Sequence, residues 1–411
     1  MTDTTRTLPR LAGQPARSAF RGAVLSRLSR LRGGAVAVEE GGERVERGEE
    51  GPLSARLEVR RPRFWRRVAL GGSLGAGEAY ADGDWEVDDL TALVRLLARN
   101  REVLTGLEGG AALLRRPLDR AFAALRRNTR AGAQRNIADH YDLGNDFFAL
   151  MLDPTMTYSS GVWADGPDAT LEEASLRKID LLCRRLRLRP EDHLLEIGTG
   201  WGSLALHAAG RYGCRVTTTT LSRTQEELAR ERVARAGLAG RVTILRQDYR
   251  DLKGRYDKLV SCEMIEAIGA DQYRPFFARC AALTAPGAPV ALQAITIADQ
   301  HYQAARREVD FIKRHIFPGS CIPSVGALVE AAARGGGFRL TELEDYGQHY
   351  ARTLAAWRAN LAARRAEVEL LTDPRFRRLW HFYLCYCEGG FAEGHLGVAQ
   401  MLFRRPEAGR P

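Results

Sequence analysis

The chain has 411 residues, of which 45% are hydrophobic and 27% are charged, so it is long enough for two domains that each bury a core. Its apolar runs are shorter than the roughly 18 to 20 residues of a spanning helix, and no apolar core follows the basic N-terminus, so we expect neither a membrane span nor export. Seven cysteines without a CxxC pair indicate reduced thiols in the cytoplasm and no structural zinc site.

The net charge of +10 is concentrated in two segments. Residues 1–34 hold seven arginines against one aspartate, and residues 111–135 hold the same numbers. Both interleave arginine with apolar residues, which on a helix gives an apolar stripe flanked by cations that suits anionic lipid headgroups. Solvated arginine-rich helices are an equal alternative. Nucleic acid is disfavoured because stacking aromatic residues are sparse there.

Composition divides the chain into four parts. Residues 1–34 predict a flexible basic N-terminus that ends at Gly33 and Gly34. Residues 35–110 predict a small α/β domain, with a strand-like pattern at 35–38, a charged loop at 39–51 and alternation at 55–59. Residues 111–135 predict a basic helical linker, and residues 136–411 a catalytic domain.

Strands and helices alternate in the last part. We predict strands at 194–197, 215–221, 242–245, 258–261 and 289–294, and helices from 203, from 224 and near 275–283. This alternation predicts a parallel sheet covered by helices on both faces. Ligands of such sheets bind at the carboxyl ends of the strands.

The first of these strands runs into Glu196 and a glycine turn, which consists of Gly198, Thr199, Gly200, Trp201 and Gly202. Glycines at every second position let the backbone turn tightly and approach a ligand at the start of the next helix. A dinucleotide fingerprint would need a glycine where Ser203 stands, and an acidic residue after the strand at 215–221. The spacing instead resembles motif I of class I methyltransferases, which bind S-adenosyl-L-methionine (SAM).

The next two strand ends carry further candidates for cofactor binding. Four of them follow the second strand and can hold a ribose through neutral hydrogen bonds: Thr220, Leu221, Ser222 and Gln225. An ordinary helix N-cap at Ser222 is an equal alternative. Asp248, Tyr249 and Arg250 follow the third strand, where an acid and an aromatic ring can hold and cover an adenine.

Two carboxylates, Glu263 and Glu266, follow the fourth strand and would share one face of a helical turn. A structural salt bridge is the alternative for one of them. For both, a place in the ligand cleft is the better interpretation.

The stretch at 136–163, which includes His140, resembles the signature of the cyclopropane-fatty-acyl-phospholipid synthases and the related mycolic acid methyltransferases. Ordered matches continue through the glycine turn, residues 247–251, 263–266, 311–319 and 322–324, and through 350–357 to 383–387. Upstream, residues 72–80 and 83–85 resemble the smaller N-terminal domain of the bacterial lipid-acting members.

The resemblance implies that a cis double bond in an unsaturated acyl chain attacks the methyl group of SAM, and that a bound bicarbonate ion takes a proton as the ring closes. It places Tyr158 and Ser159 at the cofactor, together with the glycines. The catalytic candidates that it adds are Glu266, Tyr350, Ile295, Cys387 and His140, the first three at the bicarbonate site. A small buried hydrophobe is the favoured alternative for Cys387.

The chain departs from the family at two catalytic candidates. Ser160 stands where the family usually has a bicarbonate-binding cysteine, and Gln293 where it usually has a histidine. Both still donate hydrogen bonds to an anion, but glutamine carries neither a proton nor a charge. Altered proton removal would favour a hydride shift and a methylene-branched or methylated chain, as in relatives that make 10-methyl fatty acids beside a separate flavin-dependent reductase.

We therefore expect a cytoplasmic methyltransferase on the inner membrane surface, which acts on unsaturated acyl chains of phospholipids. A small-molecule or RNA methyltransferase and a cofactor-binding protein without catalysis are the rival hypotheses. A homodimer and a flavin-dependent reductase partner stay open, and the sequence does not specify the acyl chain.

Overall fold

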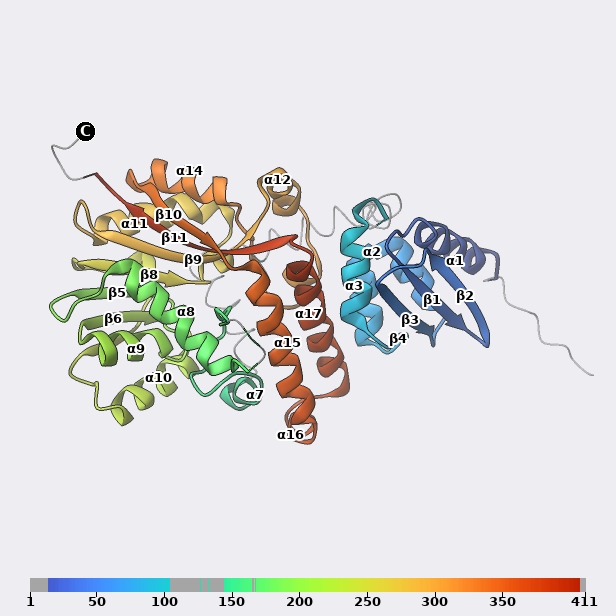
Figure 1. Cartoon of the computed structure of the whole chain (residues 1–411), viewed down its shortest axis with the longest axis horizontal. Coiled ribbons are helices and arrows are strands. Elements are labelled where there is room, and N and C mark those ends of the chain that lie inside the picture. The colour runs from blue at the N-terminus through green and yellow to red at the C-terminus, as the bar shows by residue number, and fades with distance from the viewer. Residues whose placement is uncertain are drawn as a thin grey trace, which may run out of the picture. The chain divides into compact units, whose positions relative to one another are not determined.

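The computed structural model describes residues 14–103, 126, 132, 144–164, 166 and 168–406 (Figure 1). Two compact units divide the chain: unit 1 comprises residues 1–117 and 374–382, and unit 2 comprises residues 118–373 and 383–411. Apart from residues 126 and 132, the predicted linker at 111–135 lies outside the described residues, and so does His140. None of the described helices is both long and apolar enough to cross a membrane.

Unit 1 contains a four-stranded sheet in the order β2-β1-β3-β4. Its elements are α1 (Gln14–Leu28), β1 (Gly34–Glu40), β2 (Glu43–Gly48), β3 (Leu53–Val59), α2 (Arg63–Ala81), β4 (Trp85–Val87) and α3 (Leu90–Arg99). Strand β1 pairs parallel with β3 and antiparallel with β2. In β3 every second side chain, from Leu53 to Val59, is buried, as the predicted alternation requires.

Two expectations for this part are wrong. Residues 14–28 form helix α1 rather than a flexible segment; Val24, Leu25 and Leu28 are buried, and α1 packs against α2. This apolar stripe therefore serves packing inside the unit and is not free for lipid. Residues 43–48, predicted as part of a loop, form β2, because an edge strand needs one backbone partner and tolerates charged side chains.

Unit 1 also includes residues 374–382, which the sequence assigned to the catalytic domain. Within the unit, Arg378 donates to the Trp85 carbonyl at 2.9 Å, and its guanidinium lies 4.2 Å from the centroid of the Tyr80 ring. Contacts between residues so far apart in sequence leave no local signal, so composition could not predict them.

Unit 2 contains a seven-stranded sheet in the order β10-β11-β9-β8-β5-β6-β7. Its strands are β5 (His193–Ile197), β6 (Arg215–Thr220), β7 (Val242–Arg246), β8 (Lys258–Cys262), β9 (Pro289–Ile297), β10 (Arg339–Asp345) and β11 (Leu396–Arg404). Its helices are α7 (Gly144–Met151), α8 (Leu171–Leu186), α9 (Ser203–Tyr212), α10 (Arg223–Arg235), α11 (Tyr273–Leu283), α12 (Asp299–Arg307), α13 (Phe311–His315), α14 (Val325–Gly336), α15 (Gly347–Ala363), α16 (Arg365–Leu371) and α17 (Pro374–Ala392), whose first half belongs to unit 1. Short 3-10 turns are η2 (Tyr249–Asp251), η3 (Ile265–Ile268) and η4 (Ala270–Gln272).

The predicted alternation is confirmed, but the sheet is mixed rather than parallel throughout. Strands β5 to β9 are parallel, whereas β11 runs antiparallel to β9 and β10 runs antiparallel to β11. An antiparallel strand needs no crossover helix of its own, so the pattern of alternation does not report its direction.

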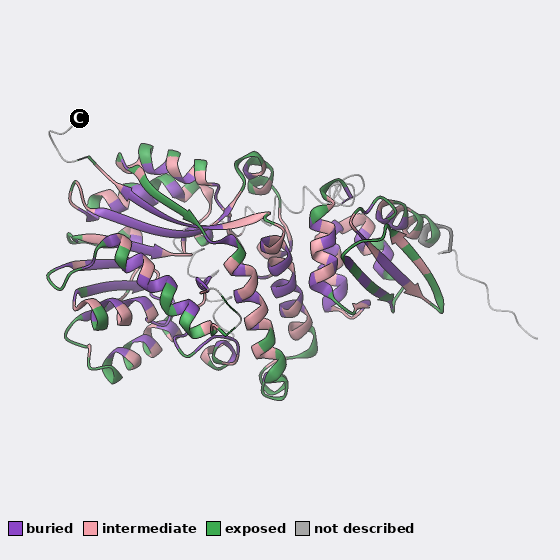
Figure 2. Ribbon diagram, in the orientation of Figure 1, coloured by how far each residue is buried: buried purple, intermediate pink, exposed green. Residues whose placement is uncertain are grey.

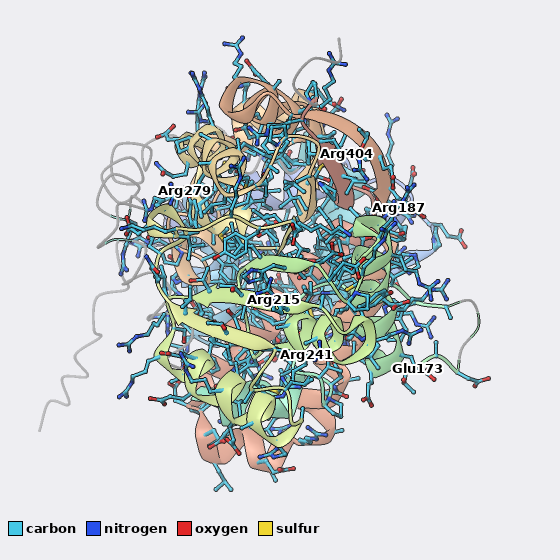
Figure 3. The ribbon with its side chains drawn as sticks, turned by 90° about the vertical axis from the view of Figure 1, so that its left-hand side faces the viewer. Glu173, Arg187, Arg215, Arg241, Arg279 and Arg404 are labelled. Carbon is cyan, nitrogen blue, oxygen red and sulfur yellow. The ribbon has the colours of Figure 1, made fainter. Side chains whose placement is uncertain are left out.

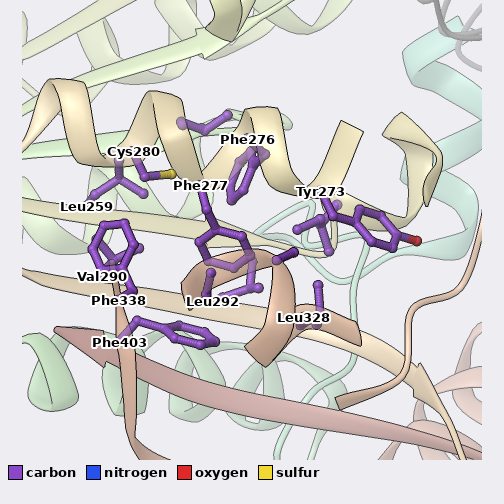
Figure 4. Close-up of a cluster of buried hydrophobic side chains, with 14 of the residues drawn as sticks. Leu259, Tyr273, Phe276, Phe277, Cys280, Val290, Leu292, Leu328, Phe338 and Phe403 are labelled. Carbon is purple, nitrogen blue, oxygen red and sulfur yellow. The ribbon is translucent and has the colours of Figure 1, made fainter. Parts of the chain in front are cut away.

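Helices cover both faces of this sheet, as predicted. Leu195 and Ile197 face a core with α11 and α14 that includes Phe276 and Phe277 (Figure 4). Leu194 faces the opposite core, which α8, α9 and α10 cover. The sheet between them is largely buried (Figure 2).

The face of the sheet that α8, α9 and α10 cover changes from apolar to polar toward the carboxyl ends of the strands. A register row crosses β8, β9 and β11 there, formed by Cys262, Gln293 and Gln400.

Candidate active site

The glycine turn adopts the conformation that its sequence predicts. Gly198, Gly200 and Gly202 have φ values of 106°, 52° and 89°, a region that side-chain-bearing residues rarely adopt. A Cβ on Gly198 would lie 3.3 Å from the Met264 Cβ. The N–H groups of Gly198 and Thr199 donate to the Thr219 carbonyl at 3.1 and 3.0 Å, which ties the turn to β6. Helix α9 then begins at Ser203.

Glu196 lies in β5 immediately before this turn and is buried. Burial raises the pKa of its carboxyl group to about 8, although Thr218 and the Lys178 ammonium act in the opposite direction. Its Oε2 has no hydrogen-bond partner within the described part of the chain. A buried carboxylate oxygen of this kind suits a positively charged donor such as the amino group of SAM.

The second strand end is organised mainly by helix capping. Ser222 is the N-cap of α10, and its Oγ accepts from the Gln225 N–H at 3.3 Å. Thr220 Oγ1 donates to the Gln225 Oε1 at 2.8 Å, and Leu221 lies between these residues. The capping alternative is therefore present, and it fixes the side chains that the sequence proposed for a ribose.

At the third strand end, Asp248 accepts from Arg250 through the backbone N–H at 2.9 Å and through Nε at 2.8 Å. The Tyr249 ring is buried in the core, 5.6 Å from the Phe276 ring. Tyr249 therefore packs in the core and is a poor cover for an adenine, whereas the Asp248 side chain caps the turn that follows.

The segment after α7 brings the predicted residues 158–160 against α15 and α17. Tyr158 Oη lies 3.0 Å from Tyr383 Oη, and the Tyr158 ring lies between Phe148 and Trp357, 5.2 Å from each. Thr353 Oγ1 accepts from the Gly161 N–H at 3.1 Å. Helix α15, which also carries Tyr350, thereby holds this segment at the carboxyl edge of the sheet.

Glu263 is the centre of the polar contacts at this edge. Its Oε1 accepts from the Ser160 N–H at 3.0 Å and from the Gln293 Nε2 at 2.7 Å, and its Oε2 accepts from the Tyr350 hydroxyl at 2.9 Å. Burial raises the pKa of the Glu263 carboxyl, and Lys178 together with the three donors opposes that shift. Burial and the charge of Glu263 also raise the pKa of the Tyr350 hydroxyl.

Glu266 is the second buried carboxyl, one turn further along the chain in η3. Its Oε1 accepts from the Ile295 N–H, whereas its Oε2 has no partner among the described residues. Burial, followed by the nearby charge of Glu263, raises the pKa of Glu266 to about 8. The structure thus brings Glu266, Ile295, Tyr350, Ser160 and Gln293 into one site, as predicted.

Two residues of this site, Lys178 and Gln400, escaped the sequence prediction. Glu263 was placed in the ligand cleft together with Glu266, but it was given no catalytic role. Lys178 is buried and donates to the Ser159 Oγ at 2.7 Å and to the Cys262 Sγ at 3.3 Å. A lysine four residues from Ala174 and from Leu182, on the apolar stripe of a helix, is the signal that could have found it. Gln400 interrupts an apolar strand in the same way.

Cys387 lies on α17, one turn after Tyr383. Burial of its sulfur raises the pKa of the thiol, so it stays protonated and unreactive at neutral pH. This environment supports the alternative of a small hydrophobe over a catalytic role.

Comparison with known proteins finds relatives that match most of this chain. The family described as mycolic acid cyclopropane synthetase matches residues 128–401. The tuberculostearic acid methyltransferase UfaA1 of Mycobacterium tuberculosis is 40% identical over 86% of this chain and 84% of its own length. The cyclopropane-fatty-acyl-phospholipid synthase of Escherichia coli K12 is 35% identical over 86% of this chain and 89% of its own.

A solved structure of the mycolic acid cyclopropane synthase CmaA1, complexed with SAH and CTAB, is 31% identical with a TM-score of 0.62. The match covers 66% of this chain and 98% of that protein. The sheet of unit 2 is that of the class I SAM-dependent methyltransferases. The chain belongs to the mycolic acid cyclopropane synthetase family and is a SAM-dependent C-methyltransferase.

Proposed function

We propose that this chain transfers the methyl carbon of SAM to the cis double bond of an unsaturated acyl chain in a phospholipid and forms a cyclopropane fatty acid. The observation that carries the proposal is the buried pair Glu263 and Glu266, held beside the glycine turn at the carboxyl ends of the strands. An alkene is a weak nucleophile, so the site has to supply orientation, a dry environment and a proton acceptor. The names of the relatives support a lipid substrate.

The residues at the glycine turn fit SAM. The turn and the start of α9 would hold its polar groups, and Glu196 Oε2 would accept from its amino group. Bound SAM supplies an electrophilic methyl group on a sulfonium. The chain's own residues bind and orient the two reactants.

Aromatic side chains lie between the glycine turn and the two carboxylates. Trp357 contacts both Tyr158 and Tyr350, with ring centroids 5.2 and 5.9 Å apart. Aromatic faces exclude water and stabilise a cation without accepting its proton. They would therefore protect the carbocation that forms on the acyl chain until a carboxylate takes the proton.

Bicarbonate, which the resemblance implies, does not fit the residues present. Gln293 and Tyr350, two of its predicted ligands, donate to Glu263, as does the N–H of Ser160. A separate anion there would also add a second negative charge beside the Glu263 carboxylate, which these donors already hold.

We also propose that the protein works on the cytoplasmic surface of the membrane. The arginine-rich segments at 1–34 and 111–135 support this location, because each well-placed cation adds roughly 1 kcal/mol of attraction to anionic lipid.

A methylene-branched product, later reduced by a flavin-dependent partner, is the second candidate. Two observations favour it: the higher identity to the tuberculostearic acid methyltransferase, 40% against 35%, and the presence of Gln293 where the family usually has histidine.

The test is mass spectrometry of phospholipid vesicles incubated with the protein and methyl-labelled SAM. We expect the unsaturated acyl chains to gain one CH2. Fragmentation then separates a ring from an exocyclic methylene of the same mass. Labelling of RNA or a small molecule with the lipid unchanged would contradict the proposal, and so would SAM binding without turnover on any unsaturated phospholipid.

A further inference from the structure

Three hydrogen-bond donors converge on one carboxylate in this site. They come from different elements: the N–H of Ser160 in the segment after α7, the Nε2 of Gln293 in β9 and the hydroxyl of Tyr350 in α15. All three donate to Glu263, at 3.0, 2.7 and 2.9 Å. We call this arrangement the anion cup. A carboxylate and a bicarbonate ion offer the same planar pair of oxygens to such donors.

The charges around the cup argue that it holds one anion. Glu266 is buried, Glu263 is half-buried with a desolvated carboxyl group, and the charge of Glu263 contributes to the raised pKa of Glu266. The Lys178 ammonium is the cation that stabilises ionised Glu263. The Lys178 charge balances one anion, whereas a bicarbonate beside ionised Glu263 would add a second negative charge, which desolvation disfavours.

Hydrogen bonding decides which carboxyl group carries the charge. Glu263 accepts hydrogen bonds from three other residues, whereas Glu266 accepts from its own backbone N–H and from that of one other residue, Ile295, and has a buried Oε2 with no partner in the described chain. More donors favour the ionised form. Glu263 is therefore the carboxylate of the pair, and Glu266 is the neutral acid.

We propose that Glu263 replaces bicarbonate in this enzyme: its carboxylate fills the anion cup and takes the proton that the reaction releases. This inference rests on the proposed function. The π electrons of the alkene form the new C–C bond while the C–S bond breaks and its electron pair leaves with the thioether. A C–H bond of the transferred carbon then breaks, its electron pair closes the ring, and its proton goes to a carboxylate oxygen of Glu263. Neutral Glu263 returns this proton to water when the product leaves.

The backbone supplies a substitution that empties the cup. Glu263 has a φ of 47°, in the left-handed region that favours glycine, and its N–H is held by the Gln293 carbonyl at 2.8 Å. Glu263→Gly removes the carboxylate and suits the backbone. Arg187→Gly is a matched control, because Arg187 also has a positive φ, 51°, but is exposed at the end of α8 (Figure 3).

The experiment measures transfer from methyl-labelled SAM to unsaturated phospholipid vesicles in decarbonated buffer, with and without added bicarbonate. We expect the wild type and Arg187→Gly to react at the same rate in both buffers. Glu263→Gly should lose on the order of 100-fold in decarbonated buffer and regain activity with bicarbonate or formate. Glu263→Gln should lose as much without recovery, because its amide still fills the cup.

A wild-type rate that falls at least tenfold without bicarbonate and saturates when it is added would overturn the proposal. If Glu263→Gly does not fold, as judged by circular dichroism, the wild type and Glu263→Gln still decide.

Binding of 13C-labelled bicarbonate, followed by NMR line broadening, gives a readout that needs no turnover. We expect Glu263→Gly to bind bicarbonate and the wild type not to bind it. If the wild type takes up SAM but converts no phospholipid, the proposed function fails. Even then, bicarbonate binding by the wild type would contradict the occupation of the anion cup by Glu263. Bicarbonate binding by Glu263→Gly but not by the wild type would support it.

Discussion

Gln400 Nε2 donates a 2.9 Å hydrogen bond to Oε1 of Gln293, and this contact turns the other end of the Gln293 amide toward Glu263. These hydrogen bonds form a chain from Arg185 through Gln400 and Gln293 to Glu263, and the two end residues fix the direction in which each bond is donated. Arg185 can only donate, and its Nε donates to the Gln400 Oε1 at 3.1 Å, whereas an ionised Glu263 can only accept. Strand β11 therefore orients Gln293, a donor of the anion cup on the neighbouring strand β9.

Substituting Gln400→Leu should free the Gln293 amide to rotate and so weaken its hydrogen bond to Glu263. We expect kcat to fall roughly tenfold, about the worth of one charge-assisted hydrogen bond, with KM for SAM unchanged. The acidic limb of the pH–rate profile should move to higher pH, since Glu263 then depends on the Tyr350 hydroxyl, the Ser160 N–H and Lys178 against the neighbouring Glu266. Gln400→Glu keeps an acceptor for Arg185 but has no donor for Gln293, so an unchanged profile in both variants would contradict the orienting role.

The Glu266→Gln variant should bind SAM normally and lose product formation by on the order of 100-fold, because an amide can neither give nor take a proton beside Glu263, which has to release the proton that it accepts. Titration calorimetry measures SAM binding, and labelled methyl transfer measures activity. The amide is isosteric and the Ile295 N–H still finds an oxygen, so the fold should persist. An active variant would remove Glu266 from the mechanism.

Lys178→Met should impair catalysis by removing the positive charge that opposes the raised pKa of Glu263. The pKa of Glu263 then rises further, so activity at pH 7 should fall and recover partly at higher pH. Lys253→Met, at an exposed surface position, is the matched control. Equal pH–rate profiles for the two variants would show that the Lys178 charge does not act on the carboxylates.

The buried Glu196 predicts a pH dependence of stability. Its pKa rises from 4.5 to about 8 on folding, so the unfolded chain loses this proton at lower pH than the native protein does. Stability should then decrease with rising pH between these values, by roughly 1 kcal/mol per pH unit for this group. The facing groups are Thr218 on β6 and Lys178 on α8.

Urea unfolding between pH 5 and pH 8 measures this slope. Glu196→Gln should reduce the slope of the unfolding free energy against pH by the contribution of one proton. The substitution Glu191→Gln, at an exposed position, should leave the slope unchanged. Glu266, whose pKa also rises to about 8, still contributes to the slope in both variants. If the unfolding free energies of the wild type and Glu196→Gln change in parallel with pH, the raised pKa of Glu196 is wrong.

Binding to anionic vesicles should weaken as salt rises, because the arginine-rich segments act through charge that salt screens. Deleting residues 1–13, which carry Arg6 and Arg10, should lower the affinity at low salt. Co-sedimentation with vesicles of anionic and of neutral lipid measures both effects. Since the apolar stripe of α1 is buried in unit 1, binding that resists high salt would contradict this electrostatic attachment.

The sequence by itself determined the elements whose signal is local. The glycine turn and the alternating strands and helices from 194 to 294 appear in the structure where the sequence predicts them. Positive φ angles favour glycine at particular positions, and burial of one face of a strand or helix requires apolar residues at a regular spacing. Short windows of sequence therefore contain both signals.

Only the tertiary structure decided how the site is connected. The mixed sheet edge and the roles of Glu263, Lys178 and Gln400 depend on residues far apart in the sequence that meet through strand pairing and helix packing. A buried charge is stable only beside the partners that solvate it, and the pattern along one strand or helix does not name those partners. The sequence therefore named the cofactor turn, whereas the fold revealed a carboxylate in the cup where the resemblance had placed bicarbonate.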